Sequence, residues 1–426
     1  MAETRLVVEH REQLWSLLVE AAQIEHMIMC TYLYACFSLK TAPDEGLTAE
    51  QADAVARWQE TVTGIAIEEM LHLALVMNVM TAIGAAPSLT RPNFPRHSEF
   101  LPPGVEFALL PFGADSLTHF LYLERPEGME RVDAAEFIPA APPPEPVSQA
   151  ELMPRLQGFL TVGHLYRGIE QGLSYLVGEL GEPVLFVGEP RAQATPERFR
   201  WPQLIAVTDL ASARAALDEI IEQGEGARGD WRPAHYGRFF GVWNEYQKLR
   251  EQDPSFEPAR PVIPAFTQQP YDIDEPQPQP TEPLTREVAE LFNLGYEVLL
   301  QVLTRFFTHT DETDEQLDAL VHAAIGIMAG VLKPLGIALT RLPMGPENPG
   351  RTAGAAFQMY YKMGNFVPWR NAAWVLLSER AAMLSRQCAE TATRDGAPAA
   401  VSSAATTAAA ISEQLARHVP QDLRPV

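Results

Sequence analysis

Apolar positions recur with the spacing of a helix through most of the chain. They predict a long amphipathic helix over residues 7–39 and a second one over 48–84. Thr48 and Gln51 fit a capping box at the start of the second helix, and Gly84 follows its last turn. Three further helices are predicted in the same half of the chain, over residues 148–180, about 209–223 and 234–250. The pattern is that of a mostly α protein whose first part is a four-helix bundle.

Between the second and third helices, residues 88–147 break the helical period. They contain a short extended stretch at 105–110 and a Pro-rich connector at 138–147. An irregular insertion of this length in a compact domain is usually functional. We expect it to cover one end of the bundle, where it could serve as a substrate lid.

The second half of the chain follows a Pro-rich linker, residues 251–284. Helical patterns resume over 285–307, 312–334 and 367–391, with a Gly- and Pro-rich loop at 335–354. Four parts are therefore predicted: a metal-binding domain at 1–250, the linker, a smaller helical domain at 285–391, and an Ala-, Ser- and Thr-rich tail at 392–426. The smaller domain shows no set of metal ligands, so we expect it to be structural or to form a homo-oligomer contact.

The composition indicates which cellular compartment and which classes of binding partner to expect. The formal net charge is −23, from 32 basic and 55 acidic side chains, which makes binding to nucleic acid unfavourable. We expect no membrane span, because no run of about 18 uncharged apolar residues occurs. The N-terminus lacks the pattern of a secretory signal, and three cysteines do not make a disulfide framework. These features predict a cytoplasmic protein.

Glu25 lies on the apolar face of the first predicted helix. Its neighbours one and two turns away are all apolar or aromatic: Leu18, Ala21, Ala22, Ile28, Met29 and Tyr32. A buried carboxylate is costly unless it is protonated, paired with a cation or bound to a metal ion.

Glu69 repeats this arrangement on the second helix, with His72 as the one polar residue on its face. The two residues form a Glu-x-x-His motif, which places two metal ligands one turn apart. Two helices joined by a short loop pack antiparallel, so the central glutamates Glu25 and Glu69 can meet.

Ligands from the later helices are less regular. Glu170 is the candidate on the third predicted helix, with a pair to Arg167 as the alternative. The fourth helix lacks a second Glu-x-x-His. His235 is the candidate there, or else a helix-cap residue packed on Trp231, and Glu225 could fold back beside it or remain a solvated loop acid.

The chain resembles the ferritin-like family of the iminophenyl-pyruvate dimer synthase type, found in bacterial violacein and indolocarbazole pathways. The resemblance covers roughly residues 10–250. It is carried by these stretches: AQIEH at 22–26, TYLY at 31–34, EEMLH at 68–72 with Asn78, NFP at 93–95, FLYLERPE at 120–127, TVGHLY at 161–166, QGEG at 223–226 and HYGRF at 235–239.

The resemblance implies a dinuclear metal site in a ferritin-like bundle. Its implied ligands are Glu25, Glu69, His72, Glu170, Glu225 and His235. Oxygen-rich sites with one or two imidazoles suit iron, or alternatively manganese, better than zinc or copper.

Three further residues are candidates for catalysis. Tyr32 and Tyr166 lie on the same helices as predicted ligands, and packing is the alternative role for both. Arg238 could hold a substrate carboxylate through two hydrogen bonds, or could pair with an acid of the bundle.

The predicted function is a dinuclear, iron-type oxidoreductase acting on a small amino-acid-derived substrate, with oxidative coupling of an imine or 2-oxo acid as the implied reaction. Two other hypotheses stay open. One is a ferritin-like metal-binding or ferroxidase protein without an organic substrate, and the other is an assembly protein in which the bundle has lost its chemistry.

Overall fold

The computed structural model describes residues 6–97, 106–126, 129, 157–159, 161–226, 230–265, 267, 278–359 and 368–423. These residues form two compact units. Unit 1 comprises Met1–Ser88, Arg96–Phe107 and Phe112–Pro258, and unit 2 comprises Leu89–Pro95, Ala108–Pro111 and Ala259–Val426. Parts of the expected insertion and linker, including the connector at 138–147, lie outside the described residues.

Unit 1 is built on helices, as the apolar spacing predicts. Its main helices are α1 Arg11–Ser38, α2 Ala49–Ala82, α3 Ala114–Leu123, α4 Val162–Leu180, α7 Leu210–Gly224 and α8 His235–Gln252. Short helices α5 Glu182–Leu185 and α6 Pro196–Phe199 follow α4, and strands β1 Arg96–His97 and β2 Glu106–Phe107 form an antiparallel pair. The capping box of α2 is confirmed, because the Thr48 and Gln51 side chains each accept a hydrogen bond from the other residue's backbone.

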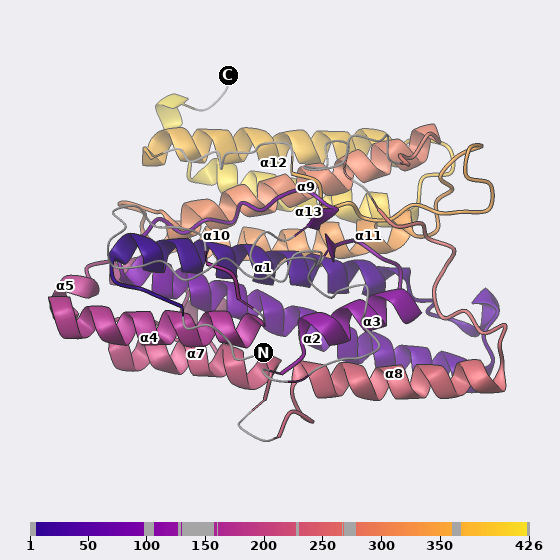
Figure 1. The fold of residues 1–426 in the computed structure, drawn as a ribbon. Coiled ribbons are helices and arrows are strands. Elements are labelled where there is room, and N and C mark those ends of the chain that lie inside the picture. Colours follow the sequence, from indigo (N-terminus) through magenta and orange to yellow (C-terminus); the bar gives the residue numbers. More distant parts are fainter. Residues whose placement is uncertain are drawn as a thin grey trace. The chain divides into compact units, whose positions relative to one another are not determined.

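Two long helices and four shorter ones make the bundle of unit 1 (Figure 1). Helices α1 and α2 pack against each other along their length. Helix α4 packs on α1 and α7, and α3 packs on α8, while α7 and α8 both contact α2. The pair α4 and α7 thus accompanies one half of α1 and α2, and the pair α3 and α8 accompanies the other half.

Two local predictions for unit 1 are wrong. The helix expected over 148–180 begins only after Thr161, whose side chain accepts a hydrogen bond from the backbone N–H of His164, and residues 157–159 are not helical. The break expected over 88–147 contains the regular helix α3, which at ten residues is too short to give a clear helical period in the sequence. In α3 the Gly113 backbone N–H donates to the Ser116 hydroxyl, which closes the first turn.

The N-terminal residues 6–8 form a strap along α4. A Cβ atom on Gly168 would lie 2.4 Å from Leu6, and one on Gly172 would lie 2.6 Å from Val8, so only glycine leaves room for the strap. The backbone of Val7 exchanges two hydrogen bonds of 2.7 Å with the Gln157 side chain. The strap therefore docks against one face of α4.

Unit 2 is also helical, with α9 Pro283–Phe307, α10 Asp314–Ile327, α11 Lys333–Leu339, α12 Arg370–Ala392 and α13 Ala399–Arg417. Helix α10 runs through a π-helical turn, Met328–Leu332, into α11, so the helix extends past the predicted end at 334. The Ala-, Ser- and Thr-rich stretch after 392, for which a marginal helix and a loose tail were the alternatives, contains the helix α13. Buried Val401, Ala404 and Ala408 lie on one face of α13, which packs on α12.

Two helical segments, Ala49–Ala82 and Asp314–Leu339, are long and apolar enough to cross a membrane by length and composition alone, a test that a buried core helix also meets. Within unit 1, 67% of the most apolar window of the first segment is buried, as in a core helix of a bundle.

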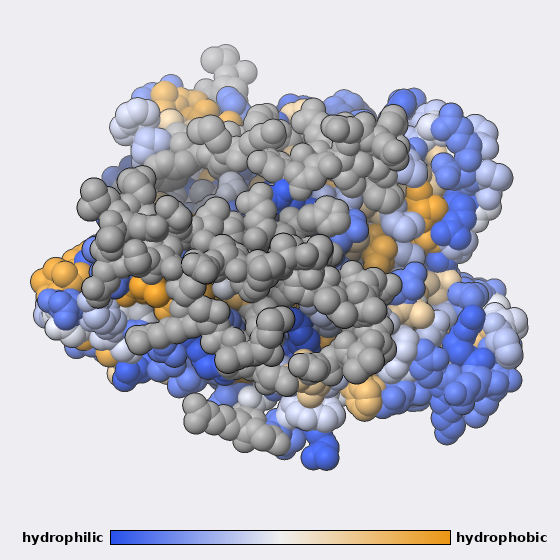
Figure 2. Space-filling model, viewed as in Figure 1, coloured by the Kyte–Doolittle hydropathy of each residue, from blue (hydrophilic) through white to orange (hydrophobic). Residues whose placement is uncertain are grey.

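Exposed large apolar side chains gather at the end of unit 1 that carries α5. They are Leu180, Val184 and Val187. An apolar patch is visible at the corresponding edge of the surface in Figure 2.

Candidate metal centre

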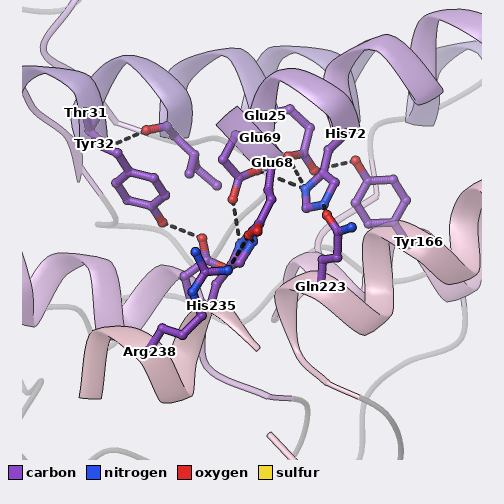
Figure 3. Close-up of polar contacts among 12 residues, drawn as sticks. Glu25, Thr31, Tyr32, Glu68, Glu69, His72, Tyr166, Gln223, His235 and Arg238 are labelled. Carbon is purple, nitrogen blue, oxygen red and sulfur yellow. Dashed lines mark hydrogen bonds and ion pairs between the residues drawn. The ribbon is translucent and has the colours of Figure 1, made fainter. Parts of the chain in front are cut away.

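The ends of four helices meet beside the middle of α1 and α2. Glu124 caps the C-terminus of α3, Gly163 lies in the first turn of α4, Glu225 caps the C-terminus of α7, and His235 is the first residue of α8. Helix ends leave backbone groups and side chains free to point inward. Acidic and histidine side chains from these ends and from α1 and α2 converge in Figure 3.

The first cluster comprises Glu25 of α1 with Glu69 and His72 of α2, all buried, with ligand atoms within 4.8 Å of one another. Nδ1 of His72 lies 3.1 Å from Oε2 of Glu69 and 3.4 Å from Oε2 of Glu25. The other oxygen of Glu25 accepts a hydrogen bond from the Tyr166 hydroxyl, and Nε2 of His72 lies 3.1 Å from Oε1 of Gln223. The sequence predicted the meeting of these three ligands, and the structure brings them together (Figure 3).

The second cluster comprises Glu69 again, with Glu124 and His235. Nδ1 of His235 lies 2.8 Å from Oε1 of Glu69 and 3.5 Å from Oε2 of Glu124. The other oxygen of Glu124 accepts from the Tyr32 hydroxyl, and Nε2 of His235 lies 2.8 Å from Oε2 of Glu68. The two clusters therefore repeat one pattern and share a single carboxylate, Glu69.

The acids and imidazoles of the clusters perturb one another strongly. Burial and the neighbouring Glu69 carboxylate raise the pKa of Glu25 to about 8. Burial alone would lower the pKa of His72, but the Glu69 and Glu25 carboxylates raise it to about 10. Burial opposes ionisation of Glu69, yet the positive His72 and His235 hold its pKa below the usual value.

His235 shows the same balance. Burial opposes its charge, but Glu69 and Glu124 raise its pKa well above the usual value. Without a metal ion, protons on Glu25 and on both imidazoles offset the buried negative charge.

The tyrosines are neutral hydrogen-bond donors to the outer oxygens of the clusters. Burial, then the adjacent Glu124, raises the pKa of Tyr32 well above its usual value, and burial with Glu25 does the same for Tyr166. Both hydroxyls thus keep their protons at ordinary pH and fix the carboxylates they contact.

The donor arrangement fits a metal pair. His235 must carry a proton on Nε2, because that atom contacts the Glu68 carboxylate. The Nδ1 lone pair then faces Glu69 and Glu124, an arrangement that is repulsive unless a proton or a cation lies between them. Three carboxylates and two imidazoles with inward Nδ1 atoms are compatible with a site for two metal ions.

Glu225 lies beside the clusters but outside both of them. It lines a cavity together with Glu25, Glu69, His72, Glu124 and Tyr166. Its Oε1 accepts from the backbone N–H of Gly163 at 3.0 Å, and its Oε2 accepts from Arg167 at 2.9 Å. A Cβ on Gly163 would lie 2.1 Å from Glu225, so glycine makes this contact possible.

Two other predicted site residues have different surroundings. Glu170 is not brought to the clusters: it lies on the partly exposed side of α4, with Oε1 3.5 Å from Nε of Arg214 on α7. Arg238 donates to Glu68 of α2. This is the ion pair with an acid of the bundle that was the alternative to a substrate contact.

Three contributors were missed by the sequence analysis: Glu124, Glu68 and Gln223. Glu124 stands in the stretch FLYLERPE that carried the family resemblance, so a signal for it existed. Glu68 directly precedes Glu69 in α2, and Gln223 lies in the last turn of α7. Both residues also stand in stretches that carried the resemblance, EEMLH and QGEG, but neither has a spacing that distinguishes it from a surface residue.

Comparisons with known proteins indicate the family of this chain. The sequence profile of the ferritin-like family matches residues 18–243. The chain is 28% identical over 396 residues to dichlorochromopyrrolate synthase of Lentzea aerocolonigenes, covering 85% of this chain and 37% of that protein. It is also 28% identical over 364 residues to 2-imino-3-(indol-3-yl)propanoate dimerase of Chromobacterium violaceum, covering 82% of this chain and 34% of that protein.

The chain thus spans about a third of the length of these curated relatives. A solved structure, a ferritin-like protein from Caulobacter vibrioides, aligns with a TM-score of 0.47 and 16% identity over 74% of this chain and 96% of that one. The profile match covers more than half of the chain and includes α2 and the first residues of α8, which carry Glu69, His72 and His235. This chain therefore belongs to the ferritin-like family.

Proposed function

We propose that unit 1 binds two metal ions, iron or manganese, and that the chain is an oxidoreductase acting on a small amino-acid-derived substrate. The observation that carries the proposal is the position of Glu69, whose two oxygens face the Nδ1 atoms of two different buried histidines. A carboxylate in that position can bridge two ions. Glu25 with His72 would complete one position, and Glu124 with His235 the other.

A pair of such ions supplies electron transfer to dioxygen or peroxide within a site that excludes water. The chain's own residues provide that exclusion. Leu123, Val162 and Ile220 line the cavity beside the clusters, and both tyrosine hydroxyls hold the outer oxygens of the carboxylates.

The substrate class follows from the relatives and from one contact of the cavity. The printed names of the relatives describe a synthase of dichlorochromopyrrolate and a dimerase of an indolyl imino acid. We therefore propose oxidative coupling of an imino or 2-oxo acid derived from an amino acid. Arg167 and the Gly163 N–H already hold one carboxylate, that of Glu225, at the cavity wall. A substrate carboxylate that displaced Glu225 would find these two donors at the cavity, whereas Arg238 is paired with Glu68 of α2.

The test combines elemental analysis with turnover. We expect about two metal ions per chain and aerobic consumption of an imino acid generated in place from an aromatic amino acid. His72→Ala should abolish turnover, whereas Glu170→Gln, the matched acid outside the clusters, should leave metal content and turnover unchanged.

Other results would decide against parts of the proposal. Full turnover by metal-free protein would overturn it. Two ions per chain with oxidation of added iron, but no consumption of any imino acid, would instead support a ferritin-like ferroxidase.

A further inference from the structure

The two clusters have the same inner arrangement. In each one, a histidine Nδ1 faces one oxygen of Glu69 and one oxygen of a second glutamate, and a buried tyrosine donates to that glutamate's other oxygen. The imidazole rings are nearly parallel, with an interplanar angle of 23° and centroids 5.4 Å apart. By these contacts alone, two bound ions would be equivalent.

The contacts behind the histidines are different. Nε2 of His72 faces a neutral amide, Oε1 of Gln223, which is held in place because Nε2 of Gln223 donates to Glu219 at 2.5 Å. Nε2 of His235 faces a carboxylate, Oε2 of Glu68. The same oxygen of Glu68 also accepts from Nη1 of Arg238, so this carboxylate is held between an imidazole and a guanidinium group. Figure 3 shows Gln223 beside His72, and Glu68 beside His235 and Arg238.

A carboxylate behind a ligating histidine orients the ring and makes its free nitrogen a stronger donor, and loss of such a partner typically weakens metal binding about 10- to 100-fold. A neutral amide gives a weaker form of the same effect. Resting on the proposed function, we infer that the two metal positions are inequivalent, and that the position of Glu124, Glu69 and His235 binds its ion first. Glu68 is then a positioning residue that acts through His235.

The experiment is a titration of the metal-free full chain with Mn²⁺, followed by electron paramagnetic resonance. A single bound Mn²⁺ and an exchange-coupled pair give different spectra. We expect the isolated-ion spectrum to grow up to about one equivalent and then convert to the coupled spectrum, with dissociation constants about 10- to 100-fold apart. His72→Ala should keep the tight ion, and His235→Ala should lose it.

Glu68→Gln tests the cause. The amide can still accept from His235 and Arg238, so the fold is preserved while the carboxylate is removed. We expect the two dissociation constants to converge and the isolated-ion spectrum to diminish. Glu245→Gln is the matched control, because Glu245 also lies on the contact of α8 with α2, where it accepts from Arg57 and Trp58. It should titrate like the unaltered protein.

A double variant separates orientation from net charge. Glu68→Gln leaves the charge of Arg238 uncompensated, and Glu68→Gln with Arg238→Gln restores the local sum. If the constants stay converged in the double variant, the loss of a carboxylate acceptor behind His235 is the cause; if the wide separation returns, net charge alone explains it and the inference is overturned. Simultaneous uptake of both ions by the unaltered protein would also overturn it, whereas no uptake of Mn²⁺ or Fe²⁺ would overturn the proposed function itself.

Discussion

The half of the centre on α1 and α2 and the half on α3 and α8 have nearly the same inner geometry but different origins. Glu25 and His72 stand in the interior of long helices, where burial and helical spacing fix their direction. Glu124 and His235 stand at the end of one short helix and the start of another. One half is therefore determined by helical spacing and the other by where helices begin and end.

This difference explains why no second Glu-x-x-His is needed. In a regular bundle the fourth helix would pass the site and supply an acid and a histidine one turn apart. Here α7 ends at Gly224 and α8 begins at His235, so no continuous helix passes Glu69 on this side. Glu124, from the end of α3, supplies the missing acid.

The largest effect should come from Glu69→Gln, because Glu69 is common to both halves. We expect metal content to fall from about two ions per chain to nearly none, as measured by elemental analysis after desalting. The control is Glu170→Gln, which makes the same chemical change on α4, outside both clusters. Retention of one tightly bound ion in Glu69→Gln would show that the halves are independent.

Glu25→Gln and Glu124→Gln compare the halves directly. Each variant should lose about one ion, because each acid belongs to one cluster only. The measurement is again metal content, with circular dichroism to show that the helices are intact. If Glu124→Gln kept both ions, the half on α3 and α8 would not be a metal position.

Metal affinity should rise with pH. In the metal-free protein the pKa of Glu25 is raised to about 8 and that of His72 to about 10, so both groups carry protons at pH 7 that a metal ion must displace. Each displaced proton makes binding about tenfold tighter per pH unit until the pH passes that group's pKa. Competition titrations with a chelator between pH 6 and pH 8 check this.

A further measurement tests the same proton displacement. The binding enthalpy should change with the ionisation enthalpy of the buffer, because protons are released. Affinity that does not vary with pH, after correction for the chelator, would contradict the assigned protonation.

The smallest of these effects should come from the tyrosines. Tyr166→Phe and Tyr32→Phe each remove one donor to a cluster carboxylate, and a hydrogen bond to a charged group corresponds to about tenfold in affinity. The expected result is a similar loss for both, since the two contacts are alike. A loss confined to one variant would reveal a difference between the halves that the contacts do not show.

The sequence predicted the long helices α1 and α2 and the trio Glu25, Glu69 and His72 because both depend on spacing along one helix. It did not predict α3, since ten residues among turns give few helical periods to recognise. It placed Glu170 in the site by analogy with a regular third helix. In the structure that helix begins at Val162 with Glu170 beside Arg214, and the acid of the second cluster comes from α3.

The contacts behind the two histidines could not be predicted from helical spacing, for a different reason. Glu68 and Gln223 matter only through the ring nitrogens they face, and those contacts join residues 167 and 151 positions apart in the chain. Spacing along one helix carries no information about such distances. Only the packing of α7 and α8 on α2 creates them.

The strap of residues 6–8 has a practical consequence for anyone who prepares this protein. Leu6 packs against Gly168, which lies two positions after Tyr166, the tyrosine that donates to Glu25. A purification tag joined too close to Leu6, or a cloning boundary drawn at the first helix, would disturb α4 at the level of the two clusters. A spacer ahead of the strap protects the chemistry as well as the fold.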